Sequence, residues 1–338
     1  MKNLTKFLIV LAISSLSIIA CDEEVIVEDP TLEPNGLALE QKIAEHRNNA
    51  KEHFNVDLSS TAGTTITSEN GTIITFYYGS VKDADNNLVS GIIEVSLLEI
   101  FDKSDMVLMN KTTMGLLPDG NHQALKSGGQ FLLEASQGEE ELYINGNLKV
   151  MVPVSNTGIA DPDMTLYANE WGEDDDCDLI TCPDDVWEEV EDTSLWGQGT
   201  VLALENAAGV TYYSCFVQNF GWSNIDRFMA DPSPKTMIKV KTPEEYNNTN
   251  CAVYVSFDGQ EYSLAALDVY LEDLQVYSEH YGQVPIGSNI HVIAVSIVED
   301  QYYSSFKAVS VEADMTIEMD ELTETSEASL IAEINALP

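Results

Sequence analysis

The chain has 338 residues and is strongly acidic, with 15 Lys and Arg against 57 Asp and Glu and a formal net charge of −42. A field of this sign repels phosphate backbones, which excludes nucleic acid as a partner, and it repels anionic lipid headgroups as well. Hydrophobic residues make up 44% of the chain, enough for cores, so wholesale disorder is excluded and the length suits about two domains.

Residues 1–20 have the pattern of a secretory signal peptide, because Lys2 and Lys6 precede an apolar run that ends at Ala20. Ile18-Ile19-Ala20 is followed by Cys21, and this order resembles the lipobox of bacterial lipoproteins, in which the thiol receives a diacylglycerol and the signal is removed. As a helix the apolar run would extend only about 21 Å against roughly 30 Å of hydrocarbon, which argues against a spanning anchor. The resemblance predicts a lipoprotein that carries fatty acids such as palmitate at Cys21 and is held at a membrane by them.

Residues 21–36 are expected to form an acidic tether, since they contain prolines and show no hydrophobic periodicity. The stretch Asp22-Glu23-Glu24 resembles the acidic export signal that lipoproteins of the Bacteroidota carry when they are sent to the cell surface. In enterobacterial sorting, by contrast, an aspartate directly after the lipidated cysteine holds a lipoprotein at the inner membrane. We expect anchoring in the cell outer membrane with the protein facing the cell surface, and the periplasmic face is the alternative.

Residues 37–160 are predicted to contain a helix and a first β-sandwich domain. Apolar residues recur near one face of a helix over 37–54, ending with Ala50 and Phe54. From about Thr64 the chain changes to short runs of β-branched and aromatic residues separated by turn residues. The clearest strands are 72–78, 91–101, 130–135 and 148–153, and the turns are 85–87, 127–129 and 145–147. Short strands at this spacing indicate a sandwich.

Residues 71–153 carry a family resemblance. Its motifs are the strand Gly91 to Ile100, then Lys103-Ser104-Asp105-Met106, Leu125 to Phe131, and Val150-Met151-Val152-Pro153. This order looks like a domain of uncharacterised, flavobacterial-type surface lipoproteins of the Bacteroidota, which is itself similar to the β-sandwich module of ankyrins and netrin receptors. The resemblance implies a fold and a lineage. In ankyrin-type proteins the module mediates protein contacts, and a shared fold alone does not transfer that role.

Residues 161–198 are expected to be an acidic connector that contains tryptophans, with the domain boundary inside it. A second β-sandwich domain is predicted over 199–320, and a C-terminal helical tail over 321–338. Residues 220–228 resemble a Gly-Trp…Asn…Asp-Arg-Phe signature of the same lipoprotein group, with no chemistry attached to it. The predicted fold class is therefore all-β, with two β-sandwich domains, a short N-terminal helix and a short C-terminal helix.

Four cysteines remain once Cys21 is lipidated. Cys177 and Cys182 are expected to form a disulfide because the loop between them is short, and a zinc site is the weaker alternative. The pairing of Cys215 and Cys251 is left open. A disulfide-closed acidic loop would hold several carboxylates close together, and calcium takes six to eight oxygens. The candidate calcium ligands are Asp174, Asp175, Asp176 and Asp178, and a solvated acidic linker is the competing interpretation.

A second acidic pattern, Asp83, Asp85, Asn87 and Glu94, has the spacing of an EF-hand loop. Leu88 stands where that loop needs glycine, so we predict a hairpin turn and no calcium here. The sequence has no nucleophile elbow, no His-Glu-x-x-His pair and no phosphate-binding glycine loop, which favours a protein that is not an enzyme. Aromatic side chains that could either stack on sugars or pack in the interior include Trp171, Trp187, Trp196 and Trp222.

These observations favour a non-catalytic, lipid-anchored envelope protein that acts as a surface binding or structural interaction module. The expected partners are the membrane, through the lipid at Cys21, and an envelope protein or a glycan. A carbohydrate-binding lipoprotein of a glycan-uptake system is the first alternative, and a surface hydrolase is the second.

Overall fold

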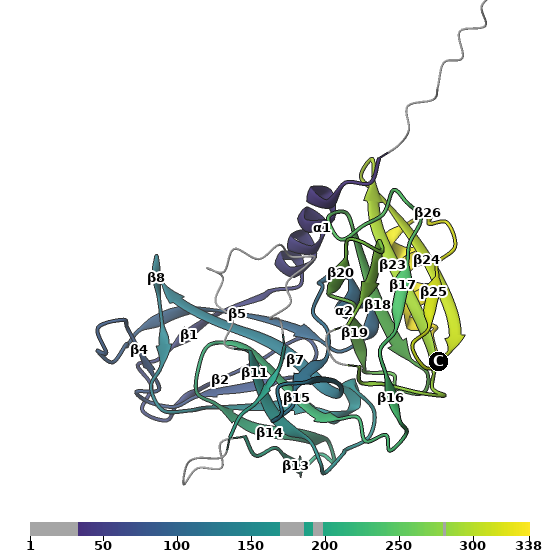
Figure 1. Ribbon diagram of the computed structural model, residues 1–338. Coiled ribbons are helices and arrows are strands. Elements are labelled where there is room, and N and C mark those ends of the chain that lie inside the picture. Colours follow the sequence, from purple (N-terminus) through teal and green to yellow (C-terminus); the bar gives the residue numbers. More distant parts are fainter. Residues whose placement is uncertain (1–32, 170–185, 192–198, 280–281) are drawn as a thin grey trace, which may run out of the picture. The chain divides into compact units, whose positions relative to one another are not determined.

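The computed structural model describes residues 33–169, 186–191, 199–279 and 282–338 (Figure 1). Residues 33–338 form one compact unit. Among the described residues, strands make up 47% and helices 11%, which confirms the predicted all-β fold with short terminal helices.

The first sandwich consists of two antiparallel sheets that pack around one apolar core. The core includes Val56, Ile74, Ile93, Phe131 and Val150. The larger sheet has the order β1-β5-β7-β15-β11-β12, with β6 and β8 also paired to β7. Its strands are β1 (Glu52–Asp57), β5 (Ile92–Ile100), β6 (Met114–Leu116), β7 (His122–Gln137), β8 (Glu140–Glu141), β11 (Thr165–Asn169), β12 (Glu188–Glu189) and β15 (Gly221–Phe228). The smaller sheet is β13 (Leu202–Glu205), β14 (Thr211–Val217), β10 (Leu148–Pro153), β3 (Ile73–Phe76) and β2 (Thr64–Thr67), in that order.

A short ribbon closes one end of the first sandwich, where β4 (Val81–Lys82) pairs with β9 (Tyr143–Ile144). After β10, η1 (Val154–Asn156) forms a single 3-10 turn.

The second sandwich has its own core, which includes Ile238, Val253, Val255, Val292 and Ile317. One sheet is β19 (Leu264–Ala266), β18 (Cys251–Phe257), β23 (Asn289–Val298), β24 (Gln301–Ser310) and β26 (Thr323–Thr325). The other is β20 (Val269–Leu271), β21 (Val276–Ser278), β17 (Lys239–Lys241) and β25 (Thr316–Glu318), and β16 (Lys235–Thr236) pairs with β22 (Val284–Pro285). β17 and β25 run parallel, whereas the other pairs of this sandwich are antiparallel.

The N-terminal helix is shorter than its periodicity predicts. Asn35 caps α1 (Gly36–Asn49), because its side chain accepts the N–H of Ala38. The helix ends at Asn49, before Phe54. Residues beyond it form β1, because the alternation that places Phe54 and Val56 on one face matches the register with β5. Over a few residues, apolar side chains spaced for one face of a helix can also fit one face of a strand. The hydrophobic pattern therefore did not locate the end of the helix.

Two further helices lie against each other. The predicted C-terminal helix is confirmed as α3 (Glu327–Asn335), capped by Ser326, with Leu330 and Ile334 buried. α2 (Lys103–Leu108) was not predicted, and Asp102 caps it through the N–H of Asp105. The Asn335 amide contacts Ser104 of α2 through two hydrogen bonds of 3.2 and 3.0 Å. None of the helices in the described ranges is long and apolar enough to cross a membrane.

The division between the sandwiches differs from the predicted boundary within 161–198. β14 and β15 lie C-terminal to that boundary, yet β14 pairs with β10, and β15 lies between β7 and β11. Ile225 of β15 is fully buried in the first core. The chain therefore passes to the second sandwich after Phe228, and not within the acidic connector.

Hydrogen bonds and an apolar cluster join the two sandwiches. Leu98 and Ile100 of β5 share a buried cluster with Tyr254 and Ile293 of the second sandwich. The Thr113 hydroxyl accepts the N–H of Leu264 at 2.9 Å and donates to its carbonyl at 3.1 Å. The backbone N–H of Ser127 also donates to Tyr262 O at 2.9 Å.

We predict that Thr113→Val lowers the free energy of unfolding by about 2 kcal/mol, because it leaves the buried N–H of Leu264 without its acceptor. Equilibrium denaturation in urea measures the change. Thr65→Val on exposed β2 is the matched control and should change stability by less than about 0.5 kcal/mol. Equal effects of the two substitutions would contradict a special role for the Thr113 hydroxyl.

Candidate functional site

The site residues that the sequence predicts lie outside the described residues. These are Cys21, the pair Cys177 and Cys182, and the calcium candidates Asp174, Asp175, Asp176 and Asp178. Lipidation, the disulfide and calcium binding therefore stay predictions. Across the described ranges, no group of three or more His, Cys, Asp or Glu residues is arranged to hold a metal ion.

The remaining two cysteines are free thiols in separate cores. Cys215 lies in the core of the first sandwich and Cys251 in the core of the second. Burial raises the pKa of each thiol to about 12, so both are protonated and unreactive at neutral pH.

The EF-hand-like segment is a turn, as predicted. The Asp83 carboxylate accepts the backbone N–H of Asn87 at 2.8 Å and its side-chain amide at 3.0 Å. Asn86 adopts a left-handed conformation with φ of 66°. Glu94 lies on β5, where it pairs with Asn55 and Ser136 within the sheet. Asp83 is thus already bound within its own turn, and Glu94 belongs to a different structural element.

Two of the four tryptophans are structural. Trp187 is fully buried, and its indole N–H donates to Thr112 O at 2.8 Å. Trp222 packs edge-on against it with ring centroids 6.3 Å apart, and the Lys111 amine lies 4.5 and 5.0 Å from the two rings. Neither ring forms an open platform for a sugar. Trp171 and Trp196 lie outside the described residues.

The signature-like segment 220–228 forms a buried polar cluster at a β-bulge. Between Asn224 and Asp226 the register to β7 shifts, so that Asn224 is opposite Gln130 and Asp226 is opposite Ser127. All four side chains are essentially inaccessible to solvent. The Asn224 amide donates to Asp226 Oδ2 at 2.6 Å, and the Ser127 hydroxyl donates to Asn224 Oδ1 at 2.9 Å.

Asp226 is best described as a neutral acid. Burial raises the pKa of its carboxyl well above the usual range, and the neighbouring hydroxyl and amide only partly oppose this. Among the described residues, Asp226 Oδ1 and both polar atoms of the Gln130 amide lack hydrogen-bond partners. A proton on Asp226 removes the cost of an uncompensated buried charge. Because solvent does not reach these groups, we interpret the cluster as structural.

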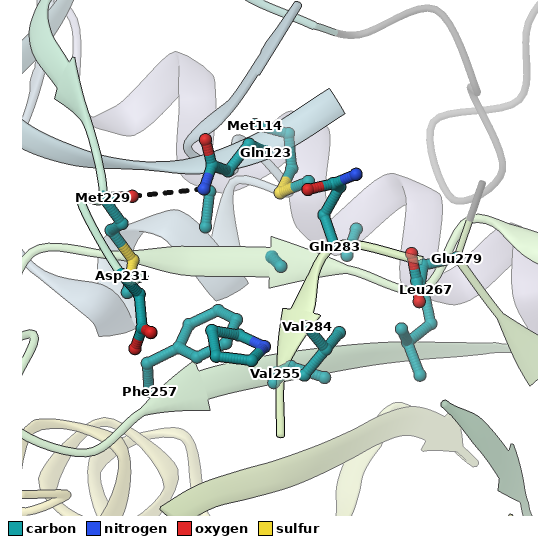
Figure 2. A pocket seen from close by; sticks show the side chains of 14 residues that line it. Met114, Gln123, Met229, Asp231, Val255, Phe257, Leu267, Glu279, Gln283 and Val284 are labelled. Carbon is teal, nitrogen blue, oxygen red and sulfur yellow. Dashed lines mark hydrogen bonds between the residues drawn. The ribbon is translucent and has the colours of Figure 1, made fainter. Parts of the chain in front are cut away.

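A pocket lies between the strand β6, the start of β7 and the second sandwich (Figure 2). Its walls are largely apolar and include Met114, Met229, Val255 and Phe257. The Gln123 amide on its wall donates to Met229 O at 3.1 Å, shown dashed in Figure 2. Its free volume is about 30 Å³, which is room for about two water molecules.

The two carboxylates that line this pocket accept hydrogen bonds from nearby backbone N–H groups. Glu279 accepts the N–H of Ile238 at 3.3 Å and that of Gly282 at 2.8 Å. Asp231 accepts the N–H of Ser233 at 2.7 Å and lies 3.8 Å from the Lys235 amine. Both acids therefore stabilise loops, and the pocket offers no matched pair for acid–base chemistry.

Exposed aromatic side chains gather instead at the closed end of the first sandwich. Tyr77 and Tyr143 are each 43% exposed, Tyr78 is 64% exposed and Leu88 is 59% exposed. We call these four residues the tyrosine apex. Tyr77 and Tyr78 lie in the loop before β4, Leu88 lies in the loop after it, and Tyr143 lies on β9, which pairs with β4 and is followed by a third loop.

Hydrogen bonds hold the three loops of the tyrosine apex together. The backbone N–H of Asn145 donates to Ser80 O at 2.7 Å, and its side-chain amide donates to Gly79 O at 2.8 Å. Leu88 lies against Gly79, 3.6 Å from the position that a Cβ would take there. The sequence pattern did not reveal this site, because Tyr77 and Tyr78 continue the β-rich run and form the end of the predicted strand 72–78. The following Gly79-Ser80 was the available turn signal.

We predict that Asp226→Asn reduces the pH dependence of stability. Since the folded-state pKa is raised, the folded protein binds more protons than the unfolded chain, and stability falls as pH rises above about 4. The asparagine variant should lose less stability than the parent between roughly pH 5 and 8. Urea denaturation across that range measures the difference. Asp105, whose pKa burial raises to about 7, contributes with the same sign in both proteins.

Asp57→Asn is the control for this experiment. The Ser59 N–H lowers the pKa of this exposed carboxyl, so its substitution acts in a more acidic range and should leave the slope at neutral pH unchanged. An unchanged slope in Asp226→Asn would mean that Asp226 is ionised in the folded protein.

Comparison with known proteins does not add to this description. No protein-family model matches the chain, and no curated protein is significantly similar to it in sequence.

Proposed function

We propose that the protein is a non-catalytic, lipid-anchored envelope protein that acts as a surface binding or structural interaction module. Cys21 would carry the lipid, and the acidic stretch Asp22-Glu23-Glu24 would direct the protein to the outer face of the outer membrane. The likeness of residues 71–153 to surface lipoproteins of the Bacteroidota supports this location.

The observation that carries the binding role is the tyrosine apex. Tyrosine presents a large, rigid, amphipathic surface at a low cost in conformational entropy, and it is enriched in binding surfaces for that reason. The four apex residues are exposed on and beside the β4–β9 ribbon of the first sandwich, and immunoglobulin-type sandwiches likewise bind through the segments that connect their strands.

The path of the chain favours access of a partner to this end. Pro34 forms a β-bridge with Val298, and the Asn35 N–H donates to Ile297 O at 2.8 Å. The tether therefore joins the protein at the second sandwich, whereas the tyrosine apex belongs to the first.

The state of the acidic groups supports a role without catalysis. Asp226 is fully buried, and the carboxylates of Glu279 and Asp231 accept hydrogen bonds from backbone N–H groups. General acid–base catalysis needs a group within hydrogen-bond reach of a substrate, which a fully buried carboxyl does not provide.

Carbohydrate binding in a glycan-uptake system is the second candidate. The exposed rings of Tyr77, Tyr78 and Tyr143 are the feature that favours it, since flat aromatic faces can stack on sugars. A glycan array probed with the soluble chain distinguishes the two functions. Selective binding of one glycan class, lost in Tyr78→Ser, would favour the carbohydrate-binding function.

We predict that Cys21→Ala abolishes labelling by a fatty-acid analogue and releases the protein from the membrane fraction. A mature lipoprotein is held by more than one acyl chain, each contributing about 0.8 kcal/mol per buried methylene, so loss of the chains removes the attachment. Ser17→Ala, in the same signal segment, is the control and should leave labelling intact. Unchanged labelling of Cys21→Ala would contradict the lipoprotein assignment.

We also expect protease added to intact cells to digest the parent protein. Lysine-directed crosslinking in vivo should link the protein to a stable envelope partner. Protection from protease until the outer membrane is opened would place it on the periplasmic face. Absence of any crosslinked partner would contradict the interaction role.

A further inference from the structure

We infer that the tyrosine apex binds a protein partner whose surface carries basic side chains around a small apolar contact area. This inference rests on the proposed interaction function and names its site and the chemistry of the partner.

Strand pairing places the apex side chains on a common face. Lys82 of β4 is directly opposite Tyr143 of β9 and forms a β-bridge with Leu88 on its other side. Directly opposed residues of antiparallel strands project from the same face, so Tyr143, Lys82 and Leu88 form one row. The neighbours Val81 and Ile144 alternate to the other face and are buried in the first core.

The remaining two tyrosines lie at the end of this row. Tyr77 to Ser80 form a tight turn in which the Ser80 N–H donates to Tyr77 O at 3.0 Å. Leu88 lies 3.6 Å from the position that a Cβ would take at Gly79 of this turn, and the Gly79 carbonyl accepts the Asn145 amide. The turn is therefore fixed beside both Leu88 and the loop that follows Tyr143.

The apex loops are held in defined conformations. Gly79 and Gly146 have φ of 72° and 92°, and Asn86 has φ of 66°, values that glycine and asparagine accommodate best. The hydrogen bonds from Asn145 and within the 83–87 turn fix the same loops. Because little freedom remains to be lost, binding through this surface costs less conformational entropy than binding through mobile loops.

The charges around the apex select the partner. Asp85 is exposed in the 83–87 turn between Lys82 and Leu88, and Glu139, Glu140 and Glu141 are exposed in the segment that leads through β8 to Tyr143. The one cation in the row, Lys82, donates to Asn86 Oδ1 at 2.8 Å. A ring of basic groups on the partner would complement this rim and accelerate association. A second copy of the chain, with a net charge of −42, would be repelled instead.

Leu88 favours a protein partner over a glycan. Its aliphatic side chain stands in the row between Lys82 and the 77–80 turn, and it is 59% exposed. An isobutyl group offers no hydrogen bond to a sugar hydroxyl, whereas protein interfaces place apolar side chains at the centre of a polar rim. The loops are also rich in Tyr, Asn, Gly and Ser, the composition of protein-binding loops on antibody sandwiches.

The test uses the full-length lipoprotein in the cells that produce it. A photo-crosslinking phenylalanine derivative replaces Tyr78 in one variant and Leu274 in a second. Leu274 is the matched control because it is also 59% exposed but belongs to the second sandwich. We expect one crosslinked protein from position 78, in at least about tenfold excess over position 274. In isolated envelopes its yield should fall as salt rises from about 50 to about 500 mM, because the pairing is electrostatic.

Substitutions in the crosslinking variant test the apex itself. Leu88→Ser should reduce the yield at position 78 by at least about fivefold, whereas Leu274→Ser should leave it within about twofold. Both residues are exposed, and circular dichroism of the purified variants verifies that each remains folded. The identified partner, expressed alone, should bind the soluble chain. Its affinity should fall in Leu88→Ser and stay unchanged in Leu274→Ser, and its surface should be basic.

Several outcomes would overturn the inference. A crosslinked species of twice the mass of the chain would identify a second copy, and glycan-array binding lost in Leu88→Ser would identify a sugar. Equal yields at positions 78 and 274 would show that the contact is not specific to the apex. If lysine-directed crosslinking captures a partner and position 78 captures none, the proposed function stands and the apex assignment fails. If neither captures a partner, both fail.

Discussion

The structure depends on the burial of strand β5 from both sides. Ile93, Val95 and Leu97 face the core of the first sandwich, while Leu98 and Ile100 face the cluster shared with the second. A sheet with two apolar faces is unstable unless both are covered, and at about 25 cal/mol per Å² the outer face alone favours docking strongly. The second sandwich and helices α1 and α2 provide that cover, which explains why residues 33–338 form one compact unit.

Polar groups then give the arrangement its specificity. Apolar contact between two sandwiches tolerates sliding, whereas the paired hydrogen bonds between Thr113 and Leu264 allow one register. The bulge at Gly128 and Gly129 has the same consequence, because it presents the Ser127 N–H to Tyr262 of the second sandwich. Gly129 adopts φ of 127° with Phe101 so close that a Cβ would collide with it. The buried Asp226 is tolerated within this bulge because a protonated carboxyl can be hydrogen-bonded without a counter-charge.

Local patterns were sufficient for the fold class and for the C-terminal helix, because both depend on short-range periodicity. They were insufficient for the division between sandwiches, since β15 fills a gap between β7 and β11 that is created by long-range pairing. Phe54 illustrates the same limit, because its spacing fits a helix until the partner strand β5 is known. The tyrosine apex was hidden for a related reason. Tyr77 and Tyr78 continue a β-rich run, and only the ribbon formed by β4 and β9 shows that the sheet has already ended there.

The acidity of the chain affects which molecules can approach the tyrosine apex. On a surface with a net charge of −42, most of the protein repels acidic proteins and other copies of itself, and at physiological salt this repulsion extends over about 8 Å. Short-range apolar contact overcomes it only where exposed apolar side chains are grouped and the loops are already ordered. Tyr77, Tyr78, Leu88 and Tyr143 meet both conditions. In the proposed interaction a partner would supply the opposite charge at the rim, so the acidity of the chain would restrict which proteins the apex can bind.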